Sequence, residues 1–130
     1  SANPSKAIVF TSLGQLRYLS ALQYVDAVVG NSSSGLTEAP SFKIGTINIG
    51  DRQNGRIKAT SVIDCTPDKN AIINAIRQLY SLGFQKSLCD VRNPYGEGGS
   101  SKKIAGILRS HPLTHLLKKI FNDLPRSPTA

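Results

Sequence analysis

The chain has 130 residues, of which 39% are hydrophobic, and this suits one domain or part of a larger one. No apolar run approaches the ~18 residues of a membrane span, and no Cys/His cluster has zinc-site spacing, so we expect neither a membrane segment nor a metal site. The net charge is +8, but the basic residues are scattered without interleaved aromatics, so we expect an anionic small ligand or an acidic partner rather than nucleic acid.

The chain is also expected to be a segment of a longer protein. It contains no methionine and begins with Ser1. Its two cysteines, Cys65 and Cys89, have no secretion signal before them, so we expect free thiols and a cytoplasmic location.

The first half of the chain alternates short β-branched runs with helical apolar spacing. In chain order we expect a strand at 7–10, a helix at 14–25, a strand at 27–29, a short helix at 33–42 that is bent or ended near Pro40, and a strand at 46–49.

The second half continues the pattern. We expect a polar loop at 52–60 and a fourth strand at 61–65. A helix then starts with Thr66 as its cap, Pro67 in its first turn and Asp68 at its positive end. Its buried stripe is predicted to be Ile72, Ile76, Leu79 and Tyr80, with Gly83 as a left-handed stop. A turn-rich loop at 93–99, a helix around 104–108 that stops before Pro112, a helix at 113–124 and a frayed tail at 126–130 complete the prediction.

Nearly continuous apolar strands, each followed by a helix, predict an α/β fold with a partial doubly wound parallel sheet. In such sheets ligands bind beyond the carboxyl ends of the strands. The loops that follow the strands are therefore the places to look for a site.

The loop GNSSSG at residues 30–35 follows the second predicted strand and opens a helix. Free amides at a helix start, glycines and serine hydroxyls make a plausible phosphate cradle. The motif is neither a Walker loop nor a dinucleotide fingerprint, and plain helix capping by serine stays open as an alternative. Glu38, one turn later, is either a ribose ligand or a solvated acid.

A second loop, GDRQNGR at residues 50–56, follows the third predicted strand. Its Arg52 and Arg56 would be charge partners for a diphosphate, or they belong to a solvated loop. Because the two loops end neighbouring strands, we expect them to lie side by side.

Three segments, GNSSSGLTEAP, INIGDRQNGR and NPYGEGGSSKKI, resemble the hydrolysing UDP-N-acetylglucosamine 2-epimerases in order and spacing. The resemblance runs from about Phe10 to Leu108. The non-hydrolysing epimerases instead carry Asp-Ser-Gly-Gly and paired glutamates at the serine loop. Lys43 and Gly45 depart from the family pattern, in which Gly and Pro often stand there, and we expect them to affect only the entry of the third strand.

The resemblance implies a glycosyltransferase-B architecture of two Rossmann-like domains with the active site between them. Residues 1–125 would be the later part of the second, UDP-binding domain. Ser32 and Ser33 would hold the diphosphate, Glu38 the ribose, and the Leu13 backbone the uracil, although Leu13 can also be read as a core residue. The full set of expected UDP-binding residues is Leu13, Asn31, Ser32, Ser33, Ser34, Gly35, Glu38, Arg52, Gln53 and Arg56.

The implied reaction eliminates UDP to give a glycal, and hydration then yields N-acetylmannosamine for sialic-acid-type or capsule sugars. It needs a base and an acid, which the resemblance places upstream of this segment. His111 and His115 are not substitutes, so the chain alone is expected to bind and not to catalyse. The resemblance further implies a missing N-terminal domain, a homo-oligomeric complete enzyme and no cofactor. A UDP-diacetylbacillosamine epimerase and a non-catalytic sugar-nucleotide module remain alternatives.

Overall fold

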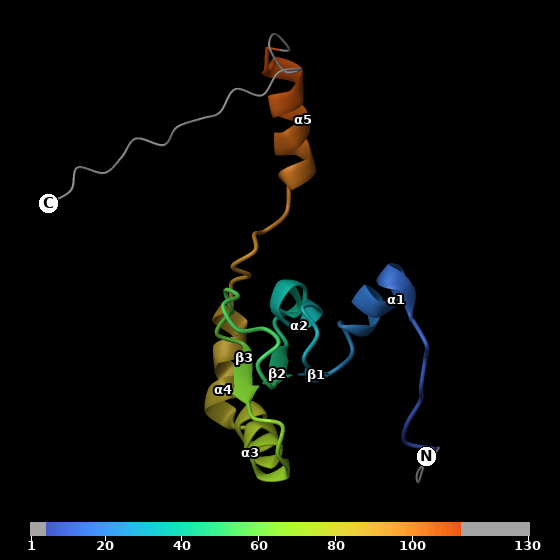
Figure 1. The fold of residues 1–130 in the computed structure, drawn as a ribbon, viewed down its shortest axis with the longest axis vertical. Helices are drawn as coiled ribbons and strands as arrows, with labels where there is room; N and C mark the ends of the chain where they lie inside the picture. The colour runs from blue at the N-terminus through green and yellow to red at the C-terminus, as the bar shows by residue number, and fades with distance from the viewer. Residues whose placement is uncertain (1–4, 113–130) are drawn as a thin grey trace, which may run out of the picture. The chain divides into compact units, whose positions relative to one another are not determined.

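A computed structural model describes residues 5–112 and has an α/β fold (Figure 1). The chain divides into two compact units, Ser1–Glu97 and Gly98–Ala130. The first unit holds a parallel sheet in the order β1-β2-β3, made of β1 (Ala27–Gly30), β2 (Gly45–Ile49) and β3 (Val62–Cys65). The predicted α/β class and the parallel sheet are confirmed.

Most helices lie close to where the apolar spacing predicted them, but the two short helices at residues 82–90 were not predicted. The helices are α1 (Gly14–Ala21), α2 (Ser34–Thr37), the 3₁₀ helix η1 (Ala39–Phe42), α3 (Lys69–Leu79), α4 (Leu82–Ser87), the 3₁₀ helix η2 (Leu88–Asp90) and, in the second unit, α5 (Ser100–Ser110). The helix predicted at 33–42 is thus two short pieces, with Pro40 in the first turn of the second. Among residues 5–112, no helix combines the length and the apolar content that crossing a bilayer requires.

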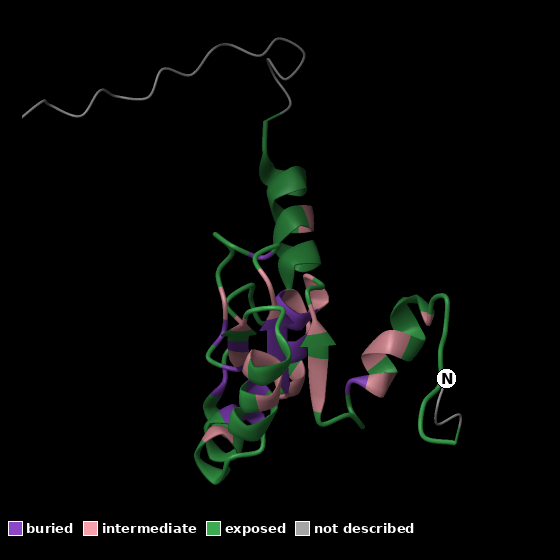
Figure 2. Cartoon of the chain, turned by 60° about the horizontal axis from the view of Figure 1, so that its bottom comes forward, coloured by how far each residue is buried: buried purple, intermediate pink, exposed green. Residues whose placement is uncertain are grey.

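Strand β2 is the centre of the sheet, and its successive side chains point to opposite faces. Thr46 faces α2, because its hydroxyl donates to the Gly35 carbonyl at 2.9 Å. Ile47 faces α3, since it forms a buried cluster with Ala75 and Leu79. Helices therefore cover both faces, and the buried residues gather around β2 (Figure 2).

The strand expected at 7–10 is not formed, so the sheet has three described strands rather than four. Ile8, Val9 and Phe10 are exposed, at 78%, 88% and 54%. An apolar, β-branched run becomes a strand only when another strand pairs with it, and none of the described residues does so here.

Both ends of α3 differ from the expectation. Asp68, not Thr66, is the N-cap: its carboxylate accepts from the backbone N–H groups of Asn70 (3.1 Å) and Ala71 (2.9 Å), while Thr66 donates to the same carboxylate. A carboxylate accepts two amides at once, so it outcompetes the hydroxyl two residues earlier. Pro67 consequently precedes the helix. Gly83 does not stop the chain in a left-handed turn, because Ser81 caps a new helix, α4, that contains it.

The buried stripe of α3 is narrower than predicted, and α1 is shorter than predicted. In α3 the buried residues are Ala75 and Leu79, whereas Ile76 and Tyr80 are exposed. Helix α1 ends at Ala21, so Leu22 follows it, buried, and Val25 is exposed. The predicted helix at 113–124, His115 and the tail at 126–130 lie outside the described residues.

Candidate functional site

The serine loop and the arginine loop meet at the carboxyl edge of the sheet. The Nε2 of Gln53 donates to the backbone carbonyl of Asn31 at 2.6 Å, and the Arg52 guanidinium donates to the same oxygen at 3.3 Å. Two loops that follow neighbouring parallel strands are thereby joined, as the order of the strands predicts. Gln53 is buried and acts here as a structural anchor, whereas Arg52 and Arg56 are exposed.

A hollow of about 440 Å³ opens at this edge. It is lined by residues that end or follow the three strands: Gly30, Asn31, Ile49, Gly50, Asp51, Arg52 and Pro67. Carboxyl ends of parallel strands are where open α/β sheets bind ligands. The hollow therefore has the position of a ligand site, and its lining carries one cationic side chain, Arg52, and one acidic side chain, Asp51.

The three serines have different surroundings. Ser33 is the N-cap of α2, but its side chain makes no cap hydrogen bond. The Ser32 hydroxyl accepts a long hydrogen bond of 3.4 Å from the Ser34 N–H. The Ser34 hydroxyl is hydrogen-bonded to the Tyr18 hydroxyl at 2.5 Å. Ser33 is thus not explained by capping, whereas Ser34 already has a partner.

Helix α2 itself has only four residues. Its aligned peptide dipoles are few, so a phosphate bound here would depend on hydroxyls, loop amides and Arg52 more than on a helix dipole. Gly35 has a packing role: a Cβ on it would lie 2.6 Å from Thr46 Cγ2. Only a glycine lets the helix approach β2 this closely.

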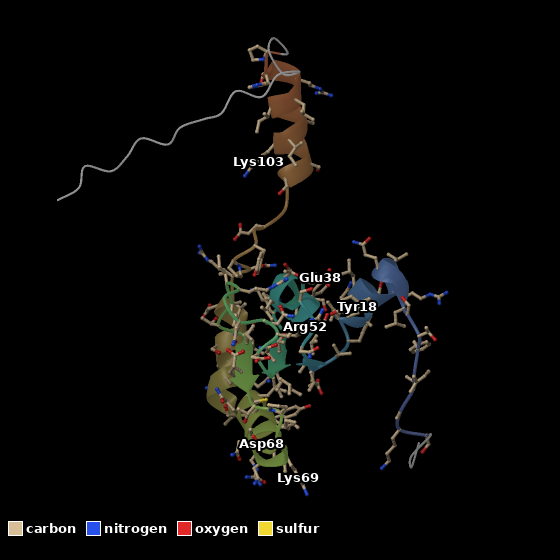
Figure 3. All side chains as sticks on the ribbon, in the orientation of Figure 1. Tyr18, Glu38, Arg52, Asp68, Lys69 and Lys103 are labelled. Atoms are coloured by element: carbon tan, nitrogen blue, oxygen red, sulfur yellow. The ribbon has the colours of Figure 1, made fainter. Side chains whose placement is uncertain are left out.

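Glu38 and Leu13 line a second hollow, of about 620 Å³, together with Tyr18 and residues 10, 12, 14 and 15. Glu38 is half-buried between α2 and η1, and Leu13 is the half-buried N-cap of α1. The structure thus brings together the two residues expected to hold the nucleoside. Figure 3 shows Tyr18, Glu38 and Arg52 projecting from α1, from the junction of α2 and η1, and from the loop after β2.

Tyr18 was not singled out from the sequence and belongs to the helix expected at 14–25. Its hydroxyl bond to Ser34 links α1 to the serine loop, which places it at the second hollow. A buried tyrosine usually needs a polar partner, and that need was the signal that could have pointed to this contact.

A further polar group, Lys58 with Asp64 and Asn48, was not singled out from the sequence. Lys58 Nζ lies 2.8 Å from Asp64 Oδ1, and Asn48 Nδ2 donates to the same oxygen at 2.7 Å. Partial burial by itself would raise the pKa of Asp64. The hydrogen bonds from Lys58 and Asn48 outweigh this and hold the pKa below its usual value. Lys58 and Asp64 line a third hollow, of about 560 Å³, which shares Gly50, Asp51 and Pro67 with the first hollow. Asp64, a charged residue inside the strand predicted at 61–65, was the sequence feature that could have indicated this polar group.

Metal-binding and thiol chemistry can be considered for the described residues. Within residues 5–112, no group of three His, Cys, Asp or Glu side chains is arranged to hold a metal ion. Cys65 and Cys89 are free thiols, and His111 is exposed at the end of α5. Burial, with the charges of Asp68 and Asp64, raises the pKa of the Cys65 thiol, so Cys65 is a poor nucleophile at neutral pH.

Comparison with known proteins supplies independent information. The model of the UDP-N-acetylglucosamine 2-epimerase family matches residues 1–109. A GDP/UDP-N,N'-diacetylbacillosamine 2-epimerase (hydrolyzing) of Campylobacter jejuni is 41% identical over 94% of the chain, which is 32% of that protein. The Polysialic acid biosynthesis protein P7 of Escherichia coli is 47% identical over 60% of the chain, or 20% of its own length.

A UDP-N,N'-diacetylbacillosamine 2-epimerase (hydrolyzing) of Legionella pneumophila is 32% identical over 81% of the chain and 27% of its own length. The chain therefore spans about a third or less of these curated relatives.

Proposed function

Because the chain belongs to the UDP-N-acetylglucosamine 2-epimerase family, we propose that it is the nucleotide-binding part of a hydrolysing 2-epimerase for a UDP-linked amino sugar. The observation that carries this proposal is the joined pair of loops at the carboxyl edge of the sheet, with Arg52 lining the hollow between them.

In this proposal the diphosphate lies against the serine loop. The Ser32 and Ser33 hydroxyls donate to its oxygens, and Arg52 offsets its charge. Ser33 supports this role because its hydroxyl is not used to cap α2. Gln53 and Gly35 act indirectly, the first by anchoring the Asn31 carbonyl and the second by seating α2 on β2.

The nucleoside occupies the second hollow. Glu38 accepts from the ribose hydroxyls, and the backbone at Leu13 faces the base. A carboxylate suits a ribose because it offers two acceptor oxygens to two neighbouring hydroxyl donors.

The reaction proposed for the complete protein is the loss of UDP followed by addition of water. The C2–H and C1–O bonds break, a C1–C2 double bond forms, and hydration gives the 2-epimeric free sugar and UDP. Residues of this chain bind and orient the leaving UDP, and we assign none of them as the base or acid. The product would enter the synthesis of sialic-acid-type or capsule sugars, as the name of the E. coli relative suggests for that protein.

Two amino sugars are candidates for the substrate. The family is named for UDP-N-acetylglucosamine. Two relatives are named for diacetylbacillosamine, and one of them matches 94% of the chain. Assays of the complete protein with both UDP-sugars decide between them, because the preferred sugar is released from UDP faster at equal concentration. No release from either would leave a non-catalytic sugar-nucleotide module.

The binding assignment is tested by calorimetry of UDP and uridine on the complete protein. Replacing Ser32 and Ser33 together by alanine should weaken the binding of UDP about 10- to 1000-fold, because hydrogen bonds to charged oxygens are worth about 1.5–3 kcal/mol each. Uridine, which has no phosphate, should bind as before.

A matched control replaces Ser20 and Ser87, whose hydroxyls donate to carbonyls of their own helices at 2.8 and 2.7 Å. This double variant should bind both ligands normally. Unchanged UDP binding in the Ser32 and Ser33 variant, or an equal loss for uridine, would show that the serines do not hold the diphosphate.

A further inference from the structure

The turn that contains Asn93 and Tyr95 contacts the segment that carries Glu38. Asn93 is half-buried, and its Nδ2 donates both to the Thr37 carbonyl at 2.8 Å and to the Ser41 hydroxyl at 2.7 Å. Thr37 and Ser41 stand on either side of residues 38–40. One amide group therefore holds both ends of the short segment that carries Glu38.

The orientation of that amide group is itself determined. The backbone N–H of Tyr95 donates to Asn93 Oδ1 at 2.9 Å. Because a backbone N–H can only donate, the Asn93 oxygen must face Tyr95 and its two N–H groups must face Thr37 and Ser41. The Tyr95 hydroxyl donates in turn to the Ile57 carbonyl at 3.0 Å, which fastens the turn to the end of the arginine loop.

We propose that Asn93 is a positioning residue for nucleoside binding: it holds Glu38 in the orientation that meets the ribose. Glu38 lies between two helical pieces of four residues each. Pieces this short have little stability of their own, so the direction of Glu38 depends on contacts from outside them. This inference rests on the proposed function, in which Glu38 is the ribose ligand.

The test compares Asn93→Asp with Glu38→Ala in calorimetry of UDP and uridine on the complete protein. Asn93→Asp keeps the acceptor for the Tyr95 N–H but removes the two donors to Thr37 and Ser41. It should weaken uridine binding about 3- to 30-fold, since two ordinary hydrogen bonds are lost. UDP binding should fall by at least the same factor, because UDP shares the ribose and its diphosphate is also repelled by the new carboxylate. For uridine, the loss should not exceed that of Glu38→Ala, through which Asn93 acts.

A control for the substitution itself is Asn70→Asp, on the exposed start of α3, which should leave both affinities unchanged. The decisive measurement is the double variant. With Glu38→Ala already present, Asn93→Asp should weaken uridine by less than about twofold, because no carboxylate remains to be positioned. A merely structural asparagine would instead lower the melting temperature in both backgrounds and add its loss of affinity to that of Glu38→Ala.

Three results would overturn the inference, and they can be told apart. The positioning role is wrong if the two substitutions reduce the uridine affinity additively. It is also wrong if Asn93→Asp binds uridine normally while Glu38→Ala binds it more weakly. Either result leaves the proposed function in place. Normal uridine binding in Glu38→Ala removes the ribose assignment, and the positioning role is lost with it.

Discussion

Strand β2 and the segment at residues 7–10 are both short runs rich in β-branched side chains, yet their surroundings are opposite. Strand β2 pairs with β1 on one side and β3 on the other, and Ile47 at its centre is 0% exposed. Val9, at the centre of the other segment, is 88% exposed. The difference shows that strand propensity is realised only where neighbouring strands and covering helices are present.

The largest expected effect comes from truncating the centre of β2. Ile47→Ala should lower the free energy of unfolding by about 2–5 kcal/mol, because it leaves a cavity between the sheet and α3. Val9→Ala, the matched change in the exposed segment, should stay within about 0.5 kcal/mol. Urea unfolding of the complete protein measures both. Equal losses would mean that residues 7–10 are as well packed as β2.

Adding a methyl group at a glycine tests how closely β2 is packed. A Cβ on Gly45 would lie 2.3 Å from Leu79 Cδ1 and 3.1 Å from Phe84 Cε1, so Gly45→Ala should cost about 1–3 kcal/mol. Gly83 lies in α4 with open space around it, and Gly83→Ala should stabilise by up to about 1 kcal/mol, because alanine favours helix. Melting temperatures should therefore move in opposite directions. A shift of the same sign would contradict the close packing of β2 on α3.

The junction of the two site loops is expected to be weaker than the core. Gln53→Ala removes the 2.6 Å hydrogen bond to the Asn31 carbonyl, which keeps a second donor in Arg52. The lost hydrogen bond should cost about 0.5–1.5 kcal/mol, and the cavity left by the buried side chain adds to this cost. Chemical denaturation gives this value, and Gln78→Ala, on the exposed face of α3, is the control. A loss as large as that of Ile47→Ala would place the junction within the core.

The smallest effect is the pH dependence of the Asp64 ion pair. Since the pKa of Asp64 is lowered in the folded state, its stabilisation is present above the ordinary carboxyl pKa and is lost as the pH falls through the folded value. The Asp64 side chain is 53% exposed, so screening keeps the contribution below about 1 kcal/mol. The stability difference between the natural protein and Asp64→Asn should shrink below about pH 4. A difference that grows on acidification would reverse the assigned sign.

Part of the fold follows from local sequence alone. Strands β1, β2 and β3 and helices α2, α3 and α5 were predictable, because apolar periodicity and turn residues act over a few positions. The meeting of the serine and arginine loops was also predictable, since parallel strands place their carboxyl ends at one edge of the sheet.

Other features depend on groups that are distant in the chain, and only the tertiary structure decided them. Gln53 anchors Asn31 across 22 residues, and Asn93 bonds to Thr37 across 56 residues. No local pattern marks either contact. The sequence of residues 7–10 predicts a strand, but no strand among residues 5–112 pairs with them. Local propensity sets which conformations are cheap, whereas partners brought together by folding determine which one is adopted and which side chains are left free to meet a ligand.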